Sequence, residues 1–206
     1  MRRFMASIYD IKPAFQRLLR PCVRRLAKAG ITPNQVTIFT ACLSIICGFF
    51  VALLTNHRRI FWVIPIIFLI RMALNAIDGL LAREHQMQTK LGGLLNEITD
   101  ALSDAALYIP FALLTTTSPY WIMVIIILAL CTEITGLAAI AIGDQRRYEG
   151  PMGKSDRAFV FSIIAIVLTF GITTRIWLSL IWLILIFLLC ATIINRIQQA
   201  LASAHE

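Results

Sequence analysis

Six apolar stretches alternate with short polar segments along most of the chain. They cover residues 36–54, 60–81, 91–115, 120–142, 157–173 and 176–194. Each is close to the length of about 20 residues that a helix needs to cross a bilayer. The pattern predicts an all-α, polytopic membrane protein in which residues 32–206 form a bundle of six transmembrane helices.

The segment before the first span has a different pattern. In residues 1–31 apolar and basic positions alternate with helical spacing; the apolar ones are Ile8, Ile11, Phe15, Leu18, Leu19 and Leu26, and the basic ones include Arg17, Arg20, Arg24 and Lys28. Such a helix lies in the bilayer interface with its cations at anionic headgroups, whereas a solvated basic tail would lack the continuous apolar stripe. Thr32, Pro33 and Gln35 then form a helix start with a capping box. We expect an N-terminal amphipathic interfacial helix in a chain that is a single membrane domain, residues 1–206.

The composition agrees with this prediction. Hydrophobic residues make up 59% of the 206 residues, and the mean hydropathy is +0.80. The net charge of +8 comes without a nucleic-acid-binding motif, so nucleic acid is not an expected partner.

The distribution of Lys and Arg predicts the orientation in the membrane. The predicted outer segments hold only Arg58, Arg59 and Arg175, whereas the other predicted loops and both ends hold most of the remaining Lys and Arg residues. By the positive-inside rule both termini and the loop at 84–90 are cytoplasmic.

Polar side chains interrupt the second and third spans. Residues three, four and seven apart share a helix face, which gives two polar stripes: Arg71, Asn75, Asp78 and Ala82 in the second span, and Asn96, Asp100, Ser103 and Asp104 in the third. Two antiparallel helices joined by a short loop can direct Asp78 and Asp100 into one space. Ionisable groups at membrane depth are functional candidates because burying them in lipid is costly.

The same residues suggest a cation. Carboxylate and amide oxygens are hard ligands that suit Mg²⁺ or Mn²⁺, and the absence of nearby His or Cys argues against zinc. Gly79 and Gly92 leave space for a phosphate-bearing ligand to approach the backbone. The five cysteines have no CxxC spacing and are expected to be core residues without disulfides.

The chain has Asp78 to Arg83 in the order Asp-Gly-Leu-Leu-Ala-Arg, then eight residues, then Gly92, and then Asp100 eight positions on from Gly92. This pattern resembles the signature DxxDGxxAR-x8-GxxxDxxxD of the CDP-alcohol phosphotransferase family. Asp78 and Asp100 occupy its second and fourth acidic positions. Asn75 and Asn96 stand at the first and third.

The resemblance implies an enzyme of phospholipid biosynthesis. It would transfer a phosphatidyl group from a CDP-alcohol, such as CDP-diacylglycerol, to a small acceptor alcohol and release CMP. The implied cation ligands are Asp78, Asp100, Asn75 and Asn96 for one or two Mg²⁺ or Mn²⁺ ions; Asp100 is also the implied catalytic base; and Gly79, Ala82, Arg83 and Gly92 are implied to bind nucleotide and phosphate. It further implies a homodimer in a bacterial inner membrane with its active site at the cytoplasmic face.

Lys154 and Arg157 begin the fifth span after a polar loop. In the family, cations in the corresponding region help to bind the acceptor, which favours a phosphate-bearing alcohol such as glycerol 3-phosphate. The alternative is that these are ordinary positive-inside charges.

Three other interpretations stay open. Asn75 and Asn96 remove two negative charges, so the chain is alternatively a catalytically degenerate protein that binds CDP-lipid or supports a partner. A small transporter that uses intramembrane acids as ion ligands is a further alternative. In structural terms, Arg71 can neutralise Glu133 in a buried ion pair, and the two asparagines can join helices by hydrogen bonds.

Overall fold

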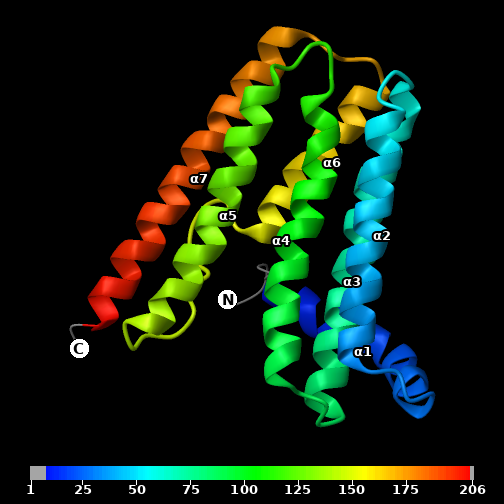
Figure 1. Ribbon diagram of the computed structural model, residues 1–206, viewed down its shortest axis with the longest axis vertical. Coiled ribbons are helices and arrows are strands. Elements are labelled where there is room, and N and C mark those ends of the chain that lie inside the picture. Colours follow the sequence, from blue (N-terminus) through cyan, green and yellow to red (C-terminus); the bar gives the residue numbers. More distant parts are fainter. Residues whose placement is uncertain (1–7, 205–206) are drawn as a thin grey trace, which may run out of the picture. The chain divides into compact units, whose positions relative to one another are not determined.

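The computed structural model describes residues 8–204, with side chains from Ala14 to Ser203. This part of the chain is helical and has no strand (Figure 1). Its elements are α1 (Ile8–Lys28), α2 (Pro33–Leu53), the 3₁₀ helix η1 (Arg58–Trp62), α3 (Val63–Glu84), α4 (Lys90–Ala112), α5 (Pro119–Ala141), α6 (Lys154–Thr169) and α7 (Arg175–Ala204). The predicted all-α class is confirmed.

Within residues 8–204, four segments are long and apolar enough to cross a membrane, namely Pro33–Leu53, Arg58–Glu84, Pro119–Ala141 and Arg175–Ser203. The chain is thus a multi-pass membrane protein. The other two predicted spans correspond to α4, which carries Glu97, Asp100 and Asp104, and to α6, which has only 16 residues. Their crossing of the membrane stays a prediction. So does the interfacial position of α1, whose first predicted residues, 1–7, lie outside the described part.

Contacts divide the chain into two compact units. We call Met1–Ser44 with Leu69–Ser103 the site unit, and Ile45–Phe68 with Asp104–Glu206 the bundle unit. The site unit contains α1, the start of α2, the end of α3 and the start of α4. The bundle unit contains the rest of those three helices together with η1, α5, α6 and α7.

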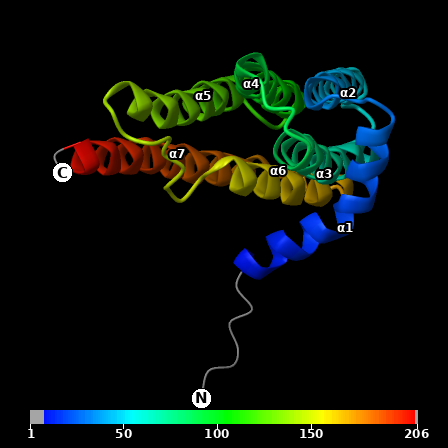
Figure 2. The same cartoon turned by 90° about the horizontal axis from the view of Figure 1, so that it is seen from below.

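In the site unit, α1 runs across the ends of α2 and α3 (Figure 2). Val23 of α1 is fully buried against Val36 of α2 and against Ile77, Leu80 and Leu81 of α3. Close van der Waals packing of such side chains holds helices together in a membrane, where lipid is as apolar as the side chains. At the start of α2 the predicted capping box is confirmed, because the Thr32 amide donates to Gln35 Oε1 at 2.9 Å and the Gln35 amide donates to Thr32 Oγ1 at 3.3 Å.

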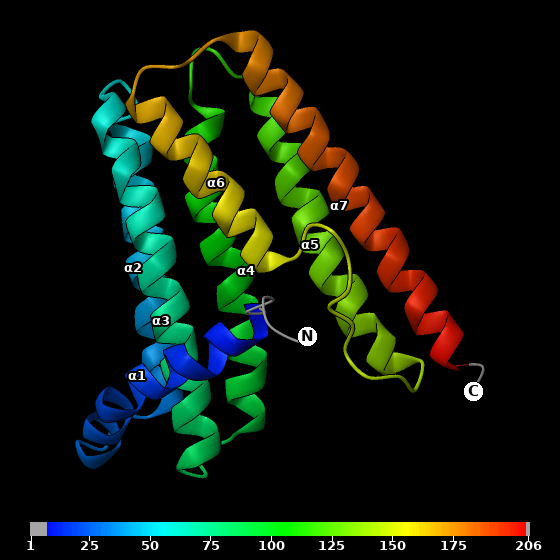
Figure 3. The same ribbon diagram turned by 180° about the vertical axis from the view of Figure 1, so that it is seen from behind.

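The bundle unit has an aromatic core. The rings of Tyr108 and Phe161 stack with their centroids 4.0 Å apart, and Phe111 meets Phe161 edge-on at 5.0 Å. Trp182 of α7 packs against the same phenylalanines. In this unit α5 and α7 lie side by side, as Figure 3 shows, and α7 continues beyond its predicted end at residue 194 to Ala204.

A group of buried and half-buried charges joins helices of the bundle unit. Glu133 of α5 lies 3.0 Å from Arg157 Nη2, 3.3 Å from Arg146 Nη2 and 3.9 Å from Arg196 Nη1. These are the ion pairs that the structure gives Glu133. The suggested pairing of Glu133 with Arg71 is corrected accordingly, since Arg71 lies in the site unit and contacts Asp100 there.

Candidate active site

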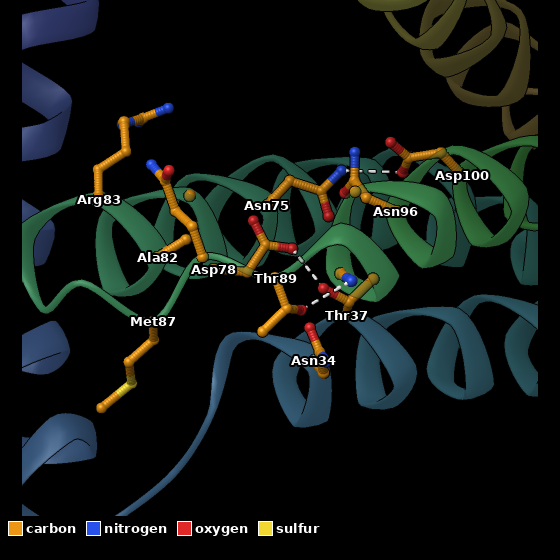
Figure 4. A pocket seen from close by; sticks show the side chains of 14 residues that line it. Asn34, Thr37, Asn75, Asp78, Ala82, Arg83, Met87, Thr89, Asn96 and Asp100 are labelled. Carbon is orange, nitrogen blue, oxygen red and sulfur yellow. Dashed lines mark hydrogen bonds between the residues drawn. The ribbon is translucent and has the colours of Figure 1, made fainter.

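The site unit has an open cavity of ≈ 490 Å³ between the start of α2 and the α3–α4 hairpin. Its walls include the eight predicted residues Asn75, Asp78, Gly79, Ala82, Arg83, Gly92, Asn96 and Asp100, and it is also lined by Asn34, Thr37, Met87 and Thr89 (Figure 4). The hairpin therefore brings Asp78 and Asp100 to one cavity from two helices, as the spacing of the polar stripes predicts.

Asp78 is held by α2. Its side chain is buried, and its Oδ2 accepts a hydrogen bond from Thr37 Oγ1 at 2.9 Å (Figure 4). Thr37 Oγ1 also lies 3.0 Å from the carbonyl oxygen of Pro33, one turn earlier in the same helix. Thr37 was not among the predicted site residues, because in the sequence it only continues the helix start at Thr32.

Asp100 is held by α3. Its Oδ1 accepts hydrogen bonds from Asn75 Nδ2 at 3.0 Å and from Arg71 Nη2 at 3.4 Å. Arg71 and Asn75 are one turn apart, so both side chains face α4. These two donors compensate a carboxylate that is only 8% exposed, and a charge so far from water needs such partners.

Gly92 permits a close approach between the start of α4 and α2. A Cβ atom at Gly92 would lie 2.6 Å from Asn34 Oδ1 and 2.9 Å from Thr89 Oγ1. The Gly92 amide donates to Thr89 Oγ1 at 2.9 Å, so Thr89 caps the start of α4. Only glycine fits this wall of the cavity without displacing its neighbours.

Arg83 contributes a cation to the same cavity. Its Nη2 lies 3.3 Å from the position that a Cβ atom would take at Gly79. The guanidinium thus extends back along α3, and a bulkier residue at Gly79 would push it aside. A guanidinium in this place can bind a phosphate through two hydrogen bonds.

The donor set fits a hard divalent cation. Two buried carboxylates and the amide groups of Asn75 and Asn96 line the cavity, and oxygens of these types bind Mg²⁺ and Mn²⁺. Within the described residues, no cluster of three or more His, Cys, Asp or Glu is arranged to hold a metal ion. The cavity is lined by two acids, Asp78 and Asp100, and has Asn75 and Asn96 at the other two acidic positions of the signature. It therefore has two negative charges in place of four.

Lys154 and Arg157, the predicted acceptor ligands, belong to the bundle unit. Arg157 is 1% exposed, and its Nη2 lies 3.3 Å from Asp104 Oδ2 and 3.0 Å from Glu133 Oε1. Lys154 is the first residue of α6, whose start is capped by Asp156 through a 2.9 Å bond from the Gly153 amide. Arg157 thus has a structural role, and acceptor binding by either residue stays a prediction.

Comparison with known proteins gives consistent results. Residues 30–196 match the family of CDP-alcohol phosphatidyltransferases. Inner membrane protein YnbA of Escherichia coli is 40% identical over 200 residues, which cover 97% of this chain and 99% of that protein. Archaetidylinositol phosphate synthase of Pyrococcus horikoshii is 35% identical over 106 residues, which cover 50% of this chain and 52% of that enzyme.

Solved structures share the fold. Phosphatidylinositol phosphate synthase of Mycobacterium tuberculosis with CDP-DAG bound has a TM-score of 0.76 at 20% identity and covers 89% of this chain and 94% of its own. The same enzyme in complex with manganese and citrate has a TM-score of 0.73, at 20% identity and with 87% of each chain covered. The predicted cofactor, Mg²⁺ or Mn²⁺, agrees with that complex. From the match over residues 30–196 and the full-length similarity to YnbA, this chain belongs to the CDP-alcohol phosphatidyltransferase family of enzymes.

Proposed function

We propose that this protein transfers a phosphatidyl group from a CDP-alcohol, such as CDP-diacylglycerol, to an acceptor alcohol and releases CMP. The observation that carries the proposal is that Asp78 and Asp100 line one cavity of ≈ 490 Å³ together with Gly79 and Gly92. The cavity thus combines two acids, which can hold a divalent cation, with the guanidinium of Arg83. A cation and a guanidinium together suit a ligand with a pyrophosphate group, and one solved neighbour is bound to CDP-DAG.

The oxygens available to a cation are those of Asp78, Asp100, Asn75 and Asn96. A bound Mg²⁺ or Mn²⁺ would supply neutralisation of the pyrophosphate charge as the leaving group departs. Arg83 would add a second positive group on the phosphates. Gly92 lets Asn34 come close to α4, because a Cβ atom at Gly92 would lie only 2.6 Å from Asn34 Oδ1, and Asn34 would then face the nucleotide from the same cavity.

Asp100 is the proposed proton acceptor. The acceptor hydroxyl gives its proton to Asp100 while its oxygen forms a bond to the phosphorus that carries the lipid. The bond between this phosphorus and the bridging oxygen breaks, and the electron pair leaves with CMP. Arg71 and Asn75 hold the carboxylate in one orientation through their bonds of 3.4 and 3.0 Å, and such positioning is a large part of catalysis in phosphoryl transfer.

We further propose an acceptor that carries a phosphate, such as glycerol 3-phosphate. Two relatives support a phosphate-bearing acceptor by name, since they are an archaetidylinositol phosphate synthase and a phosphatidylinositol phosphate synthase. In this chain Lys154, at the start of α6, is the proposed contact for that phosphate. Arg157, in the same first turn of α6, is the second proposed residue for binding the acceptor, and its guanidinium also keeps its ion pairs with Asp104 and Glu133.

The proposed setting is the cytoplasmic face of the inner membrane, with both termini inside. It is supported by the charge distribution between loops and by the inner-membrane relative YnbA. Exposed cations of α1, among them Arg17, Arg24, Arg25 and Lys28, would meet anionic headgroups while α1 lies in the interface. The six-span topology and the homodimer belong to the same proposal and rest on the family resemblance.

A second candidate function is binding of CDP-lipid without turnover. The observation that favours it is the replacement of two acids by Asn75 and Asn96, which leaves the cavity with the carboxylates of Asp78 and Asp100. Such a protein would bind the nucleotide and support a partner.

CMP release from CDP-diacylglycerol by the purified full chain separates the two candidates. The assay runs with and without Mn²⁺ over glycerol 3-phosphate, inositol phosphate, glycerol and inositol. We expect CMP only when both Mn²⁺ and a phosphate-bearing alcohol are present. Binding of the CDP-lipid with no CMP for any acceptor would contradict the enzymatic proposal and favour the second candidate.

A further inference from the structure

The hydroxyl of Thr37 lies between two acceptors in the wall of the cavity (Figure 4). Its Oγ1 is 2.9 Å from Asp78 Oδ2 on α3 and 3.0 Å from the carbonyl oxygen of Pro33, one turn earlier on α2. A threonine hydroxyl has one proton to donate, so it serves one of these acceptors at a time. An ionised carboxylate is the stronger acceptor, because its charge strengthens the hydrogen bond. The proton of Thr37 is therefore directed at Asp78.

The next two buried hydroxyls of α2 stay within their own helix. Thr40 Oγ1 donates to the carbonyl oxygen of Val36 at 2.8 Å, and Ser44 Oγ donates to that of Thr40 at 2.7 Å. Such a bond to the preceding turn is an ordinary way for a helix to satisfy a hydroxyl. Thr37 is within bonding distance of the same kind of carbonyl, so its burial alone does not require a bond to α3. The bond to Asp78 thus calls for an explanation at the cavity.

The same end of α2 also sets a second wall of the cavity. Asn34 lies one turn before Thr37 and lines the cavity with it. A Cβ atom at Gly92 of α4 would lie 2.6 Å from Asn34 Oδ1, so α2 and α4 approach closely there. Through the bond from Thr37, α2 holds Asp78 of α3 in a fixed orientation relative to this wall. A ligating carboxylate needs such support, and loss of its hydrogen-bond partner typically costs roughly 10–100-fold in metal affinity or activity.

We infer that Thr37 is a positioning residue for the cation: its hydroxyl orients the Asp78 carboxylate for binding the divalent ion, and it acts through that carboxylate. The inference rests on the proposed function, in which Asp78 is a cation ligand, and it adds a residue of α2 to the site. It concerns the hydroxyl group of Thr37. Packing of the methyl group is a separate matter, and the two can be separated by substitution.

Three variants make this separation. Thr37→Val keeps the shape of the side chain without the hydroxyl, Thr37→Ser keeps the hydroxyl without the methyl group, and Thr40→Val removes a buried hydroxyl of the same helix that bonds to Val36. Free Mn²⁺ is measured by electron paramagnetic resonance as the metal alone is titrated into each purified full chain. We expect Thr37→Val to weaken Mn²⁺ binding at least ~10-fold, and the other two variants to stay within ~3-fold of the native chain. Thermal unfolding checks that each variant is folded, and Thr37→Ala replaces Thr37→Val if the latter is not.

A double variant tests whether Thr37 acts through Asp78. In an Asp78→Asn background the charged ligand is already lost, so Thr37→Val should change the remaining Mn²⁺ affinity by less than ~3-fold, since two changes that act through one group do not add. Losses that add, native Mn²⁺ binding by folded Thr37→Val, or equal losses from Thr37→Ser and Thr37→Val would overturn the inference. Weakened Mn²⁺ binding by Thr37→Val, found with a native chain that binds Mn²⁺ but releases no CMP, would contradict the proposed function and leave the inference standing.

Discussion

Arg157 lies 3.0 Å from Glu133, with its Nη2 on Glu133 Oε1, and the same nitrogen lies 3.3 Å from Asp104 Oδ2. One guanidinium thus joins α4, α5 and α6 in the interior of the bundle unit. Its Nη1 also donates to Thr132 Oγ1 at 3.1 Å. A charge that is 1% exposed is tolerated in a membrane protein only with such partners.

Arg157→Ala should destabilise the fold strongly. Removing one partner of a buried ion pair leaves the other charge uncompensated, which costs about 3–5 kcal/mol. Arg157→Lys keeps the charge and should lose less. Thermal unfolding in detergent measures both. If Arg157→Ala unfolds like the native chain but loses transfer to phosphate-bearing acceptors, its main role is acceptor binding and the structural account of this residue is wrong.

Gly92→Ala should damage the cavity, and Gly93→Ala provides a matched control. The new Cβ at Gly92 would lie 2.6 Å from Asn34 Oδ1, whereas a Cβ at Gly93, which lines the same cavity, meets nothing within 4 Å. Overpacking of this kind costs about 1–3 kcal/mol. We expect Gly92→Ala to weaken binding of CDP, measured by calorimetry, and Gly93→Ala to bind it normally. Equal binding by the two variants would mean that the close approach to Asn34 does not shape the nucleotide site.

Restoring both acids should strengthen cation binding. The double variant Asn75→Asp, Asn96→Asp raises the number of carboxylates lining the cavity, and the added charges attract Mn²⁺ at short range. We expect its Mn²⁺ affinity to rise by at least ~10-fold, equivalent to about 1.4 kcal/mol. Unchanged affinity in a folded double variant would show that these two positions do not line the ion site.

The loop between α5 and α6 should lose stability in acid. A hydrogen bond from Arg147 lowers the pKa of Asp144 below its usual value of 3.8. A lowered folded pKa means that the stabilisation is present above the unfolded pKa and is lost as the pH falls through the folded pKa. Asp144→Asn should therefore lower the unfolding temperature at pH 7, and the difference from the native chain should shrink below about pH 4. A difference that stays the same size as the pH is lowered through the acid range would indicate that the carboxylate charge is not responsible.

The spacing of apolar and polar residues along the chain was enough to predict the helices and the polar faces of α3 and α4. Each of the six predicted spans overlaps a described helix, although the spans at 91–115 and 157–173 run past the ends of α4 at Ala112 and α6 at Thr169. The capping box at Thr32 marks the start of α2 correctly. Helical periodicity also predicts that Asp78 and Asp100 share a cavity, because each lies on the polar face of its helix.

Long-range pairings were not predictable in the same way. Periodicity shows which face Arg71 occupies but not which residue it meets, and its described acidic partner is Asp100 rather than Glu133. The basic residues at the start of α6 suggested a ligand site, yet Arg157 turns into the bundle unit and pairs with Asp104 and Glu133. Thr37 was missed because its bond to Asp78 depends on how α2 packs against α3.

The central claim is that Asp78 and Asp100 act together in one cavity to cleave a CDP-linked lipid. Its most direct test is CMP release from CDP-diacylglycerol in lipid nanodiscs by the native chain, Asp78→Asn, Asp100→Asn and the control Asp144→Asn, with Mn²⁺ and glycerol 3-phosphate. The account predicts CMP from the native chain and from Asp144→Asn, and a loss of at least ~100-fold for each folded site variant, the scale of general acid–base catalysis. Undiminished CMP release by folded Asp78→Asn or Asp100→Asn would contradict it.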